Sequence, residues 1–100
     1  MRSIIALVGL VTLSAGADDL CSQVSEAAVN VMKARQGGVS RTAMMRIADQ
    51  QESPERDVMR ELIVSAYGSE VRLSNEARQQ EVAEFGEASH QKCLESQKND

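Results

Sequence analysis

The chain of 100 residues carries fifteen Asp and Glu against eleven Lys and Arg, a net charge of −4 with histidine neutral, and has one Phe, one Tyr and no Trp. Its basic residues are interspersed with acids, so it lacks the concentrated basic patch that a nucleic-acid partner requires, and we expect none. The length suits one small domain. With few large side chains to bury, such a domain would gain from a covalent cross-link.

The N-terminus has the layout of a secretory signal peptide. Arg2 precedes an apolar run over residues 4–13, which is too short to span a bilayer, since a helical span needs about 20 residues. Ala15 and Ala17 are the small side chains that a signal peptidase accepts. We therefore expect cleavage between Ala17 and Asp18.

Removal of residues 1–17 would leave residues 18–100 as a single helical domain, periplasmic or secreted, with no stable membrane span after processing. Two alternatives stay open. Lipid attachment at Cys21 is disfavoured because Asp18 and Asp19 stand just before it, where lipoproteins carry small residues. The apolar run could instead be a buried helix of the fold, although it is apolar on all sides rather than on one face.

Apolar residues that recur every three or four positions predict helices throughout the mature region. The expected helices run from Asp18 or Asp19 to the Gly37-Gly38 pair, from Ser40 to about Gln50, from Ser53-Pro54 to Gly68, and from Ser74 to about Ser96. Their expected apolar faces are Leu20, Val24, Ala27, Ala28, Val31 and Met32; Met44, Ile47 and Ala48; Val58, Met59, Leu62, Ile63, Ala66 and Tyr67; and Val82, Phe85, Ser89 and Cys93. Residues 69–73 fit no element clearly, and residues 97–100 are expected to be a disordered tail.

The two cysteines, Cys21 and Cys93, are expected to pair, because exported proteins reach an oxidising compartment. They fall in the first turn of the first helix and near the end of the last. In an up-and-down bundle these positions meet only when the number of helices is even. The sequence therefore predicts an all-α fold, a small four-helix up-and-down bundle closed by a disulfide between the first and last helices.

Residues suited to catalysis or metal binding are scarce. His90 is the only histidine, and no nucleophile turn accompanies it, so a surface role is favoured over general-base catalysis. His90 and Cys93 lie one helical turn apart, but two ligands do not make a metal site. We expect no catalytic residue, no metal and no cofactor, and hence no enzyme.

Several segments together resemble a group of small exported helical proteins, without an assigned function, that proteobacteria and their phages encode. The segments are Cys21, residues 34–40 (ARQGGVS), residues 63–67 (IVSAY), Phe85 and Cys93. The resemblance implies secretion and a helical, disulfide-closed fold, and it carries no active site across. Periplasmic immunity proteins that block cell-wall amidases, and acid-activated periplasmic chaperones, are similar in general build only.

The sequence leaves the function unknown beyond a general expectation: an exported, non-catalytic helical protein that acts by binding another protein. One alternative is a periplasmic inhibitor or immunity protein, and a second is an acid-stress periplasmic chaperone. Arg41, Met45 and Tyr67 are the candidate partner contacts, because an inhibitor should carry an exposed hot spot.

Overall fold

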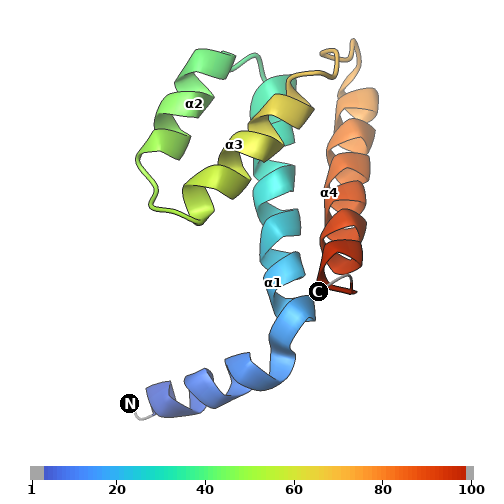
Figure 1. The fold of residues 1–100 in the computed structure, drawn as a ribbon. Coiled ribbons are helices and arrows are strands. Elements are labelled where there is room, and N and C mark those ends of the chain that lie inside the picture. The colour runs from blue at the N-terminus through green and yellow to red at the C-terminus, as the bar shows by residue number, and fades with distance from the viewer. Residues whose placement is uncertain (1–3, 99–100) are drawn as a thin grey trace.

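The chain forms four α-helices in a computed structural model that describes the backbone of residues 4–98 and the side chains of residues 19–98. The helices are α1 (Ile4–Gln36), α2 (Arg41–Asp49), α3 (Glu55–Ala66) and α4 (Asn75–Lys98). Residues 4–98 contain no strand. Successive helices alternate in direction, which confirms the predicted all-α, up-and-down arrangement (Figure 1).

The helices pair unequally. The long helices α1 and α4 pack against each other along much of their length and run antiparallel (Figure 1). The shorter α2 and α3 form a hairpin, which meets the long pair mainly through α3 against α1. The first part of α1 bends away from the other three helices and extends past the C-terminal end of α4 (Figure 1). The fold is therefore a long helical pair with a short hairpin on one side.

The hydrophobic core lies where α1, α2 and α3 meet. Its buried members are Ala28, Val31, Met32, Met44, Ala48, Leu62, Ile63 and Ala66, and α4 adds the partly buried Val82 and Phe85. Most of the predicted faces are thus confirmed. Leu20, Ile47 and Val58 were expected in the core but are 47%, 45% and 39% exposed, so these three positions are corrected to the surface.

Most of the predicted helix ends are confirmed. After α1, Gly38 adopts φ 88°, and the N–H groups of Gly38 and Val39 donate to the carbonyls of Arg35 and Ala34. These two bonds make a Schellman motif, which needs the left-handed conformation that glycine tolerates. Ser40 and Ser74 cap α2 and α4, since their hydroxyls accept from backbone N–H groups three residues on, both at 3.1 Å.

Two predicted boundaries are wrong. In the full chain α1 begins at Ile4, so the start at Asp18 or Asp19, which we expect once residues 1–17 are removed, stays a prediction. Ser53 does not cap α3; its hydroxyl instead donates to the side chain of Asp57, and α3 starts at Glu55. Helix α4 continues to Lys98, so residues 97 and 98 belong to the helix rather than to a tail, and residues 99–100 lie outside the described residues.

The first and last helices are joined at one end by the predicted disulfide. Cys21 and Cys93 are bonded, with their Cα atoms 5.5 Å apart and a sequence separation of 72. Gly86 of α4 is buried nearby against α1, where a Cβ would lie only 2.6 Å from Cγ2 of Val29. The Ser25 hydroxyl also donates to the Gly86 carbonyl at 3.0 Å. Glycine thus lets the two helices approach closely.

Among the described helices, none is both long enough and apolar enough to cross a membrane. The predicted cleavage site at Ala15, Ala17 and Asp18 lies in the part of α1 whose side chains are outside the described residues, so cleavage stays a prediction.

Candidate functional site

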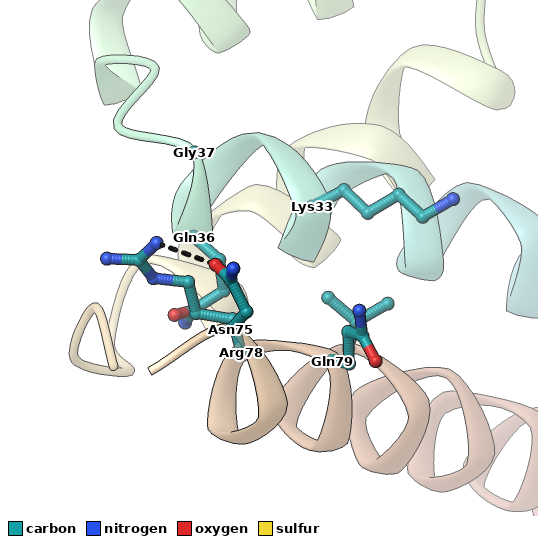
Figure 2. A pocket seen from close by; sticks show the side chains of 7 residues that line it. Lys33, Gln36, Gly37, Asn75, Arg78 and Gln79 are labelled. Atoms are coloured by element: carbon teal, nitrogen blue, oxygen red, sulfur yellow. Dashed lines mark hydrogen bonds between the residues drawn. The ribbon is translucent and has the colours of Figure 1, made fainter. Parts of the chain in front are cut away.

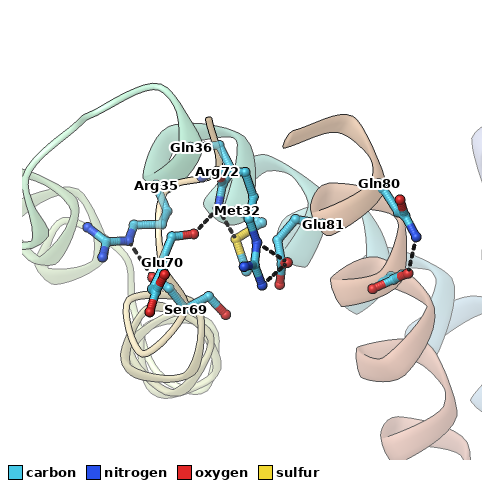
Figure 3. Close-up of polar contacts among 9 residues, drawn as sticks. Met32, Arg35, Gln36, Ser69, Glu70, Arg72, Gln80 and Glu81 are labelled. Carbon is cyan, nitrogen blue, oxygen red and sulfur yellow. Dashed lines mark hydrogen bonds and ion pairs between the residues drawn. The ribbon is translucent and has the colours of Figure 1, made fainter. Parts of the chain in front are cut away.

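The connector between α3 and α4, residues 67–74, is held against the end of α1 by one buried amide. Gln36 is 5% exposed, and its Nε2 donates to the carbonyl of Glu70 at 2.9 Å while its Oε1 accepts from the N–H of Arg72 at 2.8 Å (Figure 3). The side chain therefore pairs with the connector's backbone on both sides of Val71. Gln36 Nε2 also lies 3.6 Å from the sulfur of Met32, within the core.

A second contact fixes the start of the same connector. Arg35 Nε donates to the carbonyl of Ser69 at 2.9 Å, and its guanidinium carbon lies 5.1 Å from the centre of the Tyr67 ring. The Tyr67 hydroxyl donates to the carbonyl of Val39 at 2.6 Å, which ties the connector after α1 to the connector after α3. Partial burial raises the pKa of Tyr67 above its usual 10.0, and the positive charge of Arg35 opposes that rise.

The end of the connector is held by α4. Arg72 places Nη2 2.8 Å and Nε 3.0 Å from Oε1 of Glu81 (Figure 3). Arg78 Nε donates to the carbonyl of Arg72 at 2.8 Å. Side chains from α1 and α4 therefore fix the backbone at three of the four residues from Ser69 to Arg72. We call the connectors 37–40 and 67–74, with the helix ends that hold them, the loop end.

The residue that follows these contacts is fully exposed. Leu73 is 98% exposed, the most exposed of the large hydrophobic residues among those whose side chains are described. A leucine left in water gives up about 1.5–3 kcal/mol that burial would supply. Single exposed apolar residues are ordinary on protein surfaces, but this one is presented by a backbone that its neighbours immobilise. Leu73 is therefore suited to insert into a partner's surface.

A hollow with a volume of about 330 Å³ lies beside the loop end, between the last turns of α1 and the first turns of α4. Its lining residues are Lys33, Gln36, Gly37, Asn75, Arg78, Gln79 and Val82. The lining thus includes two cations and no carboxylate. In Figure 2 the two cationic side chains point in opposite directions, Lys33 along α1 and Arg78 back over Asn75. We call it the cationic hollow.

The three residues predicted to contact a partner lie in different settings. Tyr67 belongs to the loop end, although its hydroxyl is engaged with Val39 and its ring packs partly against the core. Arg41 is exposed at the first position of α2. Met45, also on α2, is partly buried and packs against the core cluster, which accounts for a methionine that had no place on the predicted stripe.

Sequence reasoning missed Gln36 and Leu73. Gln36 follows the apolar face of α1 and is indistinguishable by type from the exposed glutamines of the chain. Leu73 carried a weak signal, an apolar residue directly before the serine that caps α4, in a segment that fitted no helical pattern.

Groups suited to metal binding do not converge in the part of the chain that the structure describes. No three His, Cys, Asp or Glu side chains among the residues searched are placed to hold an ion. His90 lies in α4 three residues before Cys93, whose sulfur is bonded to Cys21. The site at the loop end therefore offers apolar and cationic contacts.

Comparison with known proteins adds no relative: no family model, curated protein or solved structure matches this chain.

Proposed function

We propose that this chain is an exported, non-catalytic helical protein that acts by binding another protein through its loop end. The observation that carries the proposal is the combination of a 98% exposed Leu73 with a connector fixed by Gln36 and Arg78. Binding energy in protein interfaces concentrates in a few residues that enter well-packed pockets. A side chain held in place before binding loses less conformational entropy when it binds.

The fixed connector supports one kind of binding protein over another. An inhibitor or immunity protein meets a single partner surface, so a preset contact favours its affinity. A chaperone must adapt to many clients, and promiscuous surfaces rely on flexible segments that can repack. We therefore propose an inhibitor-like or immunity-like role ahead of an acid-stress chaperone.

Export is supported by the disulfide. Disulfides persist in secreted and periplasmic proteins and are rare in reducing compartments, and Cys21 and Cys93 are joined. This pairing fits an extracellular or periplasmic location. The mass of the protein recovered from the exported fraction tests the proposal: we expect a chain that begins at Asp18 and is lighter by two hydrogens. A chain that retains residues 1–17 would contradict it.

Partner binding is tested by photo-crosslinking in the producing cell. A benzophenone amino acid at position 73 should give one discrete adduct. The same group at position 47, also exposed but on α2, should not give that adduct. The crosslinked protein is then identified by mass spectrometry, purified and titrated against the full chain.

The titration compares the unmodified chain with Leu73→Ser. Because Leu73 is 98% exposed, the variant should keep its melting temperature. It should bind the purified partner about tenfold or more weakly, since about 1.4 kcal/mol of lost burial corresponds to a factor of ten. Equal affinity of the two proteins, or the same adduct from positions 73 and 47, would contradict the proposed site.

A further inference from the structure

We infer that the cationic hollow receives an acidic segment of the partner, so that the protein recognised at the loop end presents carboxylates next to an apolar side chain. This inference rests on the proposed function and specifies the chemistry of the partner.

The charge of the cationic hollow opposes that of the whole chain. The chain has a net charge of −4, yet Lys33 and Arg78 line this hollow without an acidic residue among the lining side chains. A second hollow, of about 410 Å³, serves as the comparison. It is lined by Asp57, Arg60, Glu61, Val64, Ser65 and Lys92, so its cations are offset by two carboxylates. Of these two hollows, only the first has lining side chains with a net positive charge.

The two cations of the cationic hollow have hydrogen-bond donors without a partner among the described residues. Lys33 makes no ion pair and no side-chain hydrogen bond with any residue that the structure describes. Arg78 uses Nε on the carbonyl of Arg72 and Nη1 on Oδ1 of Asn75, at 2.8 and 3.4 Å. Its Nη2 has no hydrogen-bond partner within the described chain. Guanidinium and ammonium groups bind carboxylates through short, charge-assisted hydrogen bonds.

One residue, Arg78, contacts both the cationic hollow and the connector that carries Leu73. Arg78 lines the hollow, and its bond to Arg72 holds the residue just before Leu73. Val82 adds an apolar wall to the hollow. The two cationic side chains point in opposite directions (Figure 2), so their charged groups suit carboxylates spaced along an extended segment. The fitting ligand is therefore a peptide segment with two acidic residues and a neighbouring apolar residue.

Peptide selection tests the inference before the partner itself has been identified. The full, oxidised chain is used to select from a displayed library of random 12-residue peptides. We expect the selected peptides to be enriched in Asp and Glu beside Leu, Ile, Val or Phe. The affinity of the best peptide, measured by fluorescence anisotropy, should fall as salt is raised, because exposed charge pairs are screened.

Charge reversal locates the binding site. Lys33→Glu should weaken binding of the selected peptide about tenfold or more, because one attractive pair becomes repulsive. It should leave the fold intact, since the Lys33 side chain makes no ion pair or hydrogen bond in the described chain. Lys92→Glu makes the same change in the second hollow and should alter the affinity less than twofold.

Three results would overturn the inference: no enrichment of acidic residues, unchanged affinity of Lys33→Glu, or equal weakening by Lys92→Glu. Sedimentation with phosphatidylglycerol vesicles that Lys33→Glu abolishes would assign the hollow to a membrane surface instead, and would also overturn it. The proposed function can fail separately. A partner captured through position 73 with no acidic preference in the library would retain the function and remove the inference. Acidic selection without a position-73 adduct would contradict the proposed function and leave only the preference of the hollow for acidic peptides.

Discussion

The two ends of the α1–α4 pair are held together by different kinds of interaction. At one end Cys21 and Cys93 are covalently joined, with Gly86 packed closely on α1 nearby. At the loop end, hydrogen bonds from Gln36 and Arg35 hold the connector's backbone. The comparison teaches that the bundle is closed at one end while the other is left to position an exposed side chain. The proposed recognition site thus lies at the end opposite to the disulfide.

Breaking the covalent end should have the largest effect. Replacing both cysteines with alanine should lower the free energy of unfolding by about 4 kcal/mol, the loop-entropy value for a separation of 72 residues. Urea unfolding measures the loss. Reduction of the unmodified protein should reproduce it, whereas an unchanged midpoint in either sample would mean that packing alone closes this end.

A bulkier residue at the close contact between α1 and α4 should have the second largest effect on stability. Gly86→Ala should destabilise the fold by about 2 kcal/mol, because the new methyl group would meet Val29 Cγ2 and the overpacking exceeds the gain in helix propensity. Adding Val29→Ala makes room for the methyl group and should recover part of the loss in thermal unfolding. A stabilised Gly86→Ala variant would show that the helices separate at little cost.

Removing the amide at the loop end should have a smaller and more local effect. Gln36→Leu leaves the Arg72 N–H and the Glu70 carbonyl without their partner, which should cost about 1.5 kcal/mol. Amide hydrogen exchange at Arg72 should accelerate, while exchange at Ile63 in the core of α3 follows only the global change. Gln91→Leu, an exposed control on α4, should change neither quantity. Equal protection of Arg72 in both variants would refute the role of Gln36.

The smallest expected effect depends on pH. Tyr67→Phe removes the bond to Val39 and should cost about 1 kcal/mol at pH 7. Burial raises the folded-state pKa of Tyr67, so its contribution is complete below the unfolded-state value near pH 10 and is lost as pH rises through the folded-state pKa. The difference in stability between the two proteins should therefore shrink at pH 11 in urea titrations. A difference independent of pH would contradict this assignment.

Features that depend on residues close together in the sequence could be predicted from it, whereas features that depend on tertiary contacts could not. Ser40, Ser74 and Gly38 act on backbone groups within a few residues, so local rules identified them. The disulfide could be predicted because the chain has two cysteines and because an even number of helices brings them to the same end of the bundle. In the full chain no helix starts at Asp18 or Asp19, because the apolar run before these residues is helical as well.

The candidate site could not be predicted in the same way. Gln36 bonds with residues 34 and 36 positions away, and that contact exists only once α2 and α3 have turned the chain back to the end of α1. Leu73 belongs to no helical pattern of apolar residues that would single it out. Whether the Met45 side chain faces the core likewise depends on how α2 packs on α3.

The disulfide also makes residues 21–93 a closed ring that contains all three connectors. A protease that cuts once beside the exposed Leu73 would open this ring and add one water, but it would not divide the molecule. The two pieces would stay tethered through the far end and separate only on reduction. A single nick at the loop end can thus alter recognition without releasing a fragment.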